Sequence, residues 1–296
     1  MGRGSEIFST PIKTPGLGRV EVTAQPIEPK QQRRRGTLVV VPGFLLQPGA
    51  HSANRLAQTF SNVFGMEGVV VQTRAEEIIP NSLHHETQVA CHYLTSSKFN
   101  EPFIFIGNSQ GGTKATEAAN TLEGQAAGLV LLDSMGLHQL SPTELVKLFL
   151  RDAAGGASSL LRKTPHLTEH TDFKKYMRRL ACDEVLGFGS ELVLSGSHFL
   201  SRMRNDIAQI AGYVPDTSNI TCPVIDIHGI MDRPSPPGII FEDPQLRRGE
   251  REASMLRHFP NSNRVHSILA RYAGTHAMPF ERTLSAAIAA AHFLKE

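Results

Sequence analysis

The stretch Gly107-Asn108-Ser109-Gln110-Gly111 decides the fold of this chain. The apolar run Phe103-Ile104-Phe105-Ile106 precedes it and predicts a buried strand. Small residues follow it, from Gly112 to Ala119, and predict a helix. A sharp turn between a strand and a helix exposes the hydroxyl of a serine at its apex, and glycines beside that serine remove side chains that would collide. The pattern therefore predicts a nucleophile elbow with Ser109 as the nucleophile.

Short apolar runs recur along the chain and alternate with segments of helical pattern. This rhythm predicts an α/β protein with a mostly parallel central sheet that helices flank on both faces. Before it, residues 6–27 alternate apolar and polar around Pro15-Gly16-Leu17-Gly18, which predicts a hairpin. The expected strands are 38–41, 68–71, 103–106, 127–133, 223–229 and 264–270, and the expected helices include 53–64, 86–96 and 286–294.

The rhythm breaks after Gly136 and returns near residue 217. Between these points the pattern is helical, and Ser141-Pro142-Thr143-Glu144 has the composition of a helix start with a capping box. We therefore divide the chain into an N-terminal core part (1–136), an inserted helical cap (137–216) and a C-terminal core part (217–296).

Composition excludes several classes of protein. Of the 296 residues, 40% are hydrophobic and 20% charged, which is typical of a globular protein. The net charge of +2 is too small to indicate binding to nucleic acid. Three distant cysteines, Cys91, Cys182 and Cys222, argue against a disulfide framework or a structural zinc site. No signal peptide or apolar run of transmembrane length is apparent, so we expect a cytoplasmic protein with no membrane insertion.

A serine nucleophile needs a base, and the base needs an orienting carboxylate. In an α/β sheet such groups lie in loops after the carboxyl ends of strands. His276 follows the last expected strand, and Asp232 follows the strand before it. Asp133 is the rival carboxylate, because it ends the strand that follows the elbow; its other reading is a residue that orders a loop or caps the first cap helix.

The chain resembles the α/β-hydrolase superfamily, in the form that carries a helical cap after the sixth strand. The resemblance rests on the elbow and on four segments in family order: Pro42-Gly43-Phe44, Leu132-Asp133, Gly229-x-x-Asp232 and Gly274-Thr275-His276. It implies that Ser109 is the nucleophile, His276 the general base and then acid, and Asp232 the orienting carboxylate. It also implies an oxyanion hole formed by the backbone amides of Phe44 and Gln110.

These residues predict a serine hydrolase that cleaves a carboxylic ester of a small acyl substrate, with a lactone, thioester or amide as other bonds it can act on. Carbon–carbon bond hydrolysis, lyase or cofactor-free peroxidase chemistry, or ligand binding with little turnover, remain alternatives on the same scaffold. No cofactor or metal is expected: Thr113 stands where a phosphate-binding loop needs lysine, and Val89 stands where an H-E-x-x-H motif needs its second histidine. The polar segment 233–252 is read as an insertion that lines the site entrance.

Overall fold

The computed structural model describes residues 8–14, 18–43, 51–75, 82–96, 99–135, 141–147, 207–229, 244–270 and 283–295. Within these ranges the chain forms an eight-stranded sheet with the order β1-β2-β4-β3-β5-β6-β7-β8. The strands are β1 (Phe8–Thr14), β2 (Gly18–Ile27), β3 (Thr37–Val41), β4 (Glu67–Ala75), β5 (Phe103–Asn108), β6 (Ala126–Leu132), β7 (Val224–Gly229) and β8 (Val265–Ala270).

The sheet is antiparallel at one end and parallel elsewhere. β2 pairs antiparallel with β1 and with β4, which confirms the predicted N-terminal hairpin. All pairs from β4 through β3, β5, β6 and β7 to β8 are parallel. The parallel strands place the carboxyl ends of β3, β5, β6, β7 and β8 along a common edge, where an α/β protein forms its site.

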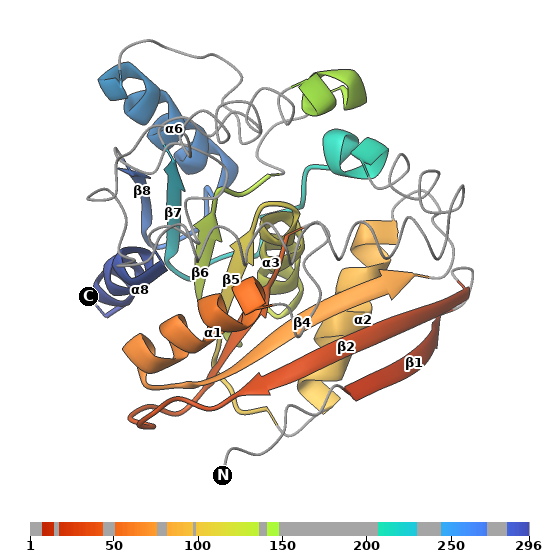
Figure 1. Ribbon diagram of the computed structural model, residues 1–296. Helices are drawn as coiled ribbons and strands as arrows, with labels where there is room; N and C mark the ends of the chain where they lie inside the picture. The colour runs from red at the N-terminus through yellow and green to blue at the C-terminus, as the bar shows by residue number, and fades with distance from the viewer. Residues whose placement is uncertain are drawn as a thin grey trace.

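Helices cover both faces of the sheet (Figure 1). The helices are α1 (His51–Phe64), α2 (Ser82–Ser96), α3 (Gln110–Thr121), α6 (Pro244–His258) and α8 (Thr283–Phe293). α1 and α8 pack with one face of the strands, around Phe60, Ile106 and Ala287. α2, α3 and α6 pack with the opposite face, around Leu94, Phe105 and Met255. Since both faces are buried, the central strands consist of continuous apolar runs rather than alternating ones.

One expectation needs correction. Residues 233–252 were read as one polar insertion, but the part from Pro244 onward belongs to α6, which follows β7 in the chain and packs against β8. The polar composition of this helix concealed it, although Pro244 is at a favoured first helical position. Residues 230–243 lie outside the described residues.

The chain leaves the sheet after β6 and returns at β7, the parallel neighbour of β6. The predicted cap falls in this connection, and most of it lies outside the described residues. Residues 142–147 and 207–212 are helical. The predicted capping box is confirmed: the Ser141 backbone amide donates to Glu144 at 2.9 Å, and the Glu144 amide donates to the Ser141 hydroxyl at 3.2 Å.

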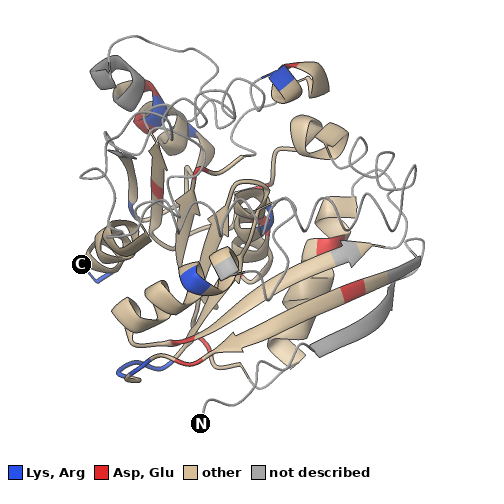
Figure 2. Ribbon diagram, in the orientation of Figure 1, with Lys and Arg blue, Asp and Glu red and all other residues tan. Residues whose placement is uncertain are grey.

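Charged residues are spread over the described elements, and α6 carries both signs (Figure 2). Among the described helices, none combines the length and hydropathy that a membrane span requires.

Candidate active site

Ser109 has a strained backbone at the junction of β5 and α3. Its φ and ψ angles are 54° and −125°, a conformation that side chains disfavour. Three backbone hydrogen bonds fix it: the Ser109 amide donates to the Leu132 carbonyl, and the amides of Gly112 and Met135 donate to the Ser109 carbonyl, each at 3.0 Å. The elbow predicted from the sequence is therefore present, and neighbouring β6 holds it in place.

Two glycines of the elbow allow close backbone approaches. A Cβ atom on Gly107 would lie 2.4 Å from the Cα atom of Gly112, so the start of α3 needs a glycine beneath it. A Cβ atom on Gly111 would lie 2.1 Å from the Val41 carbonyl oxygen and 2.5 Å from that of Pro42. Gly111 thus brings the elbow against the end of β3, the strand that leads to the expected oxyanion loop.

Asp133 shares the unusual backbone of Ser109. It directly follows β6 with φ 45°, and these two are the positive-φ residues other than glycine in the described ranges. The Asp133 side chain is fully buried, and its Oδ1 accepts a hydrogen bond from the Gly229 amide at 2.8 Å. Because backbone strain concentrates at functional sites, a strained, anchored carboxylate one strand from Ser109 is a candidate functional group.

The structure describes two of the five predicted site residues. Ser109 lies 6% exposed at the end of β5, and Gln110 begins α3. Phe44, Asp232 and His276 lie outside the described residues. Asp133, the rival carboxylate, is described and lies beside the elbow, since the Asp133 and Ser109 segments are joined through the Leu132 and Met135 backbone.

A buried polar cluster joins β7, α6 and β8, and the sequence patterns did not predict it. Asp226, fully buried, accepts two hydrogen bonds at 2.9 Å from Arg251 of α6, which is also fully buried. The Asp226 Oδ2 atom also lies 3.0 Å from His228 Nδ1 and accepts a bond from the Ser267 hydroxyl at 3.0 Å. Burial alone raises the pKa of Asp226, but the charges and hydrogen bonds of Arg251 and His228 outweigh it and hold that pKa well below its usual range.

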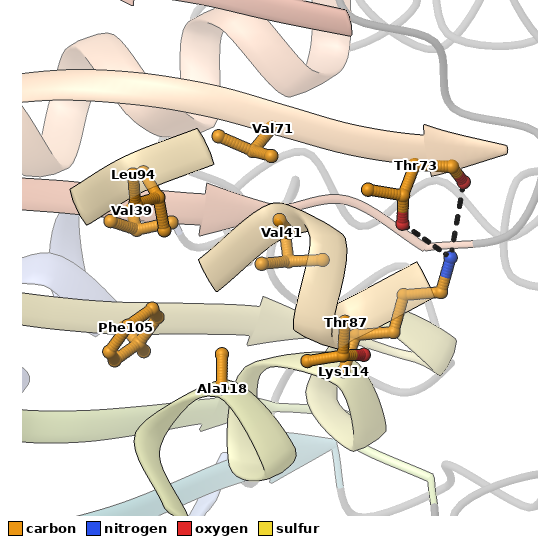
Figure 3. A pocket seen from close by; sticks show the side chains of 10 residues that line it. Val39, Val41, Val71, Thr73, Thr87, Leu94, Phe105, Lys114 and Ala118 are labelled. Carbon is orange, nitrogen blue, oxygen red and sulfur yellow. Dashed lines mark hydrogen bonds between the residues drawn. The ribbon is translucent and has the colours of Figure 1, made fainter. Parts of the chain in front are cut away.

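A second polar group lies between α2, α3 and β4. The Lys114 ammonium donates to Glu86 at 2.5 Å. It also donates to the Thr73 carbonyl and hydroxyl oxygens at 3.3 Å (Figure 3). A cavity of about 20 Å³ adjoins it, lined mainly by apolar side chains and by Thr87. That volume holds about one water molecule, so the cavity is too small to be a substrate pocket.

Glu117 of α3 connects the core to the segment that returns from the predicted cap. It accepts hydrogen bonds from the Tyr213 hydroxyl and from His84 of α2. Burial first, and then Glu117, raises the pKa of the Tyr213 hydroxyl well above its usual range. The Ser82 hydroxyl adds a contact to Gln209 at 2.5 Å. Glu117 therefore holds His84 between α2 and α3.

The described residues contain no group of three or more histidine, cysteine, aspartate or glutamate side chains arranged to hold a metal ion.

Comparisons with solved structures define the fold. An esterase from Thermogutta terrifontis is similar with a TM-score of 0.58 and 16% identity, over 97% of this chain and 98% of the esterase. A bromoperoxidase from Bacillus anthracis is similar with a TM-score of 0.57 and 13% identity, over 98% of this chain and 100% of that chain. An esterase from the archaeon Pyrobaculum calidifontis is similar with a TM-score of 0.55 and 14% identity, over 98% of this chain and 85% of that chain. No protein-family model matches the sequence, and comparison with curated proteins finds no match.

The chain has the α/β-hydrolase fold, with a strained serine at its elbow. The similar structures span nearly the whole chain and are α/β-hydrolases, which confirms the fold expected from the sequence.

Proposed function

We propose that this protein is a serine hydrolase that cleaves a carboxylic ester through a covalent acyl-Ser109 intermediate. The observation that carries the proposal is the strained Ser109 backbone at the carboxyl end of β5, fixed by hydrogen bonds to Leu132, Gly112 and Met135. A purely structural serine has no need of this conformation, because the strain costs about 1–3 kcal/mol. Two of the similar structures reported above are esterases, which supports ester hydrolysis.

The proposed mechanism has two acyl-transfer steps. The Ser109 hydroxyl attacks the ester carbonyl carbon while His276 takes its proton. The backbone amides of Phe44 and Gln110 bind the resulting oxyanion, and His276 then protonates the leaving alkoxide. In the second step water attacks the acyl-enzyme and gives a proton to His276. The tetrahedral intermediate then collapses, His276 returns that proton to the Ser109 oxygen, and the carboxylic acid leaves. Asp232 orients the imidazole and stabilises the imidazolium ion in both steps.

Asp133 is the second candidate for the orienting carboxylate. Its buried position, positive φ and anchored Oδ1 are those expected of a carboxylate with a fixed task. The two assignments predict different results for matched substitutions. If Asp232 is the acid, Asp232→Asn lowers kcat about 10⁴-fold and Asp133→Asn much less; if Asp133 is the acid, the order reverses.

The proposed substrate is a small acyl ester that binds between the sheet edge and a cap formed by residues 137–216. The core parts 1–136 and 217–296 frame that cap in the chain, since it falls between β6 and β7. Phe44-Leu45-Leu46, beside the proposed oxyanion loop, favours an apolar acyl chain over a highly charged substrate. No cofactor, metal, nucleic acid or membrane insertion enters the proposal.

The test is hydrolysis of p-nitrophenyl esters from acetate to long acyl chains by the wild type and Ser109→Ala. We expect turnover by the wild type and a loss of at least about 1,000-fold in kcat/KM in the variant. Equal activity of the two proteins would contradict the proposal. Because one similar structure is a bromoperoxidase, peroxide-dependent bromination is the second candidate activity, and the same pair of proteins tests it.

A further inference from the structure

The polar cluster of Asp226, His228, Arg251 and Ser267 joins three elements, and His228 is its residue nearest the carboxyl end of β7. Asp226 and His228 belong to β7, Arg251 to α6 and Ser267 to β8. Asp226, His228, Arg251 and Ser267 are 0%, 2%, 0% and 1% exposed. The negative charge of Asp226 is balanced by Arg251, whose guanidinium binds both carboxylate oxygens at 2.9 Å.

A buried ion pair is by itself weak evidence of a contribution to stability. Burying an ion pair removes two charges from water, and apolar side chains of similar volume are often as stabilising or more so. A hydrogen-bonded polar cluster does fix one geometry, because each donor has a set direction. We therefore infer that the cluster serves to fix the backbone position at the end of β7.

His228 links this cluster to the candidate site. Its Nδ1 atom lies 3.0 Å from Asp226 Oδ2, and the next residue in the chain is Gly229. The Gly229 amide donates to Asp133 Oδ1 at 2.8 Å. Asp232 comes three residues after Gly229. The position of Asp133 thus depends on where the end of β7 lies, and Asp232 follows the same strand in the sequence.

We propose that His228 is a positioning residue for the hydrolysis, which fixes the end of β7 through Asp226 and Arg251 and thereby places the carboxylate that orients the catalytic base. The proposal rests on the proposed function, since it assigns His228 a task in that reaction. Arg251 anchors the cluster from α6. The Ser267 hydroxyl donates to the same Asp226 oxygen as His228, but Ser267 belongs to β8 and does not adjoin Gly229 in the sequence.

The test compares substitutions that keep or remove one hydrogen-bond donor to the same oxygen atom, Asp226 Oδ2. The amide nitrogen of asparagine at position 228 takes the place of His228 Nδ1, whereas that of glutamine takes the place of Nε2. Ser267→Ala removes the other neutral donor to Asp226 Oδ2, also at 3.0 Å. We compare His228→Asn, His228→Gln and Ser267→Ala by kcat/KM over pH 5–9 and by thermal unfolding, with assays well below each midpoint.

We expect His228→Gln to lose at least about tenfold in kcat/KM, the size of a mispositioned catalytic group. The acidic limb of its pH profile moves to lower pH, because a misplaced carboxylate stabilises the imidazolium less and lowers the pKa of the base. His228→Asn and Ser267→Ala stay within about threefold of the wild type, although both unfold at lower temperature.

Three results would overturn the inference: His228→Gln with the activity and pH profile of the wild type, equal losses of activity in His228→Gln and Ser267→Ala, or equal losses in His228→Gln and His228→Asn. Each would leave the cluster a structural role only. A wild type with no hydrolase activity would instead refute the proposed function, and this inference with it.

Discussion

Replacing Gly111 by alanine tests whether the elbow and the end of β3 must touch. The added Cβ atom would lie 2.1 Å from the Val41 carbonyl oxygen, and it reaches ordinary van der Waals contact only at about 3.4 Å. Either the backbone of the elbow or that of Val41 must therefore move by about 1.3 Å, because the contacted atoms belong to the backbone and not to a flexible side chain. The movement separates the Ser109 turn from the chain that leads to Phe44.

The expected effect follows from two opposing contributions. Alanine favours a helix over glycine by about 1 kcal/mol, whereas overpacking of a fixed contact costs about 1–3 kcal/mol. We expect Gly111→Ala to lower the free energy of unfolding by up to about 2 kcal/mol, the difference between these contributions. It should also lower kcat/KM at least about 100-fold, because a displacement near 1 Å misplaces the reacting groups.

Gly249 provides the matched control. It lies in α6, and a Cβ atom added there would meet no atom within 4 Å. Gly249→Ala should raise the free energy of unfolding by about 1 kcal/mol and leave kcat/KM unchanged. Urea unfolding and ester hydrolysis measure both effects. A Gly111→Ala variant as active and as stable as Gly249→Ala would refute the steric argument.

Three further predictions concern ionisable groups. The pKa of Asp226 is lowered in the folded protein, so the stability that its carboxylate contributes is present above about pH 4 and is lost as the pH falls. Asp226→Asn should therefore weaken the dependence of the free energy of unfolding on pH at acidic pH, as measured by urea unfolding. An unchanged pH dependence in the variant would contradict this. Burial, with Glu117 as a lesser cause, raises the pKa of the Cys91 thiol to about 12, and burial raises the pKa of the Cys222 thiol to about 11. A Cys182→Ser variant should therefore show almost no reaction with Ellman's reagent at pH 8 until a denaturant exposes both thiols. Rapid reaction of the folded variant would contradict this prediction. Glu86→Gln leaves the partly buried Lys114 without a counter-charge and should lower the free energy of unfolding in urea by about 2 kcal/mol. No loss would show that the pair is not stabilising.

Local patterns were sufficient to predict the fold. The continuous apolar runs identified the parallel strands because both faces of the sheet are covered, and the glycines around Ser109 identified the elbow because β5 and α3 approach closely there. The strain at Ser109 follows from the same turn.

Contacts between distant residues were not predictable in the same way. Arg251 falls in the segment that was read as a polar insertion, and its full burial was not predictable because arginine is seldom fully buried. Its partner Asp226 lies 25 residues away in a strand, and nothing local signals the pairing. The positive φ of Asp133 likewise depends on the contact of the β6 and β7 ends, through the Gly229 amide.

The most direct test of the central claim is intact-mass and peptide analysis after treatment with a fluorophosphonate, which phosphonylates activated serines. We expect one adduct per chain, on the peptide that contains Ser109, and none in Ser109→Ala. Absence of an adduct in the wild type, or an adduct on a different residue, would contradict the assignment of Ser109 as the nucleophile.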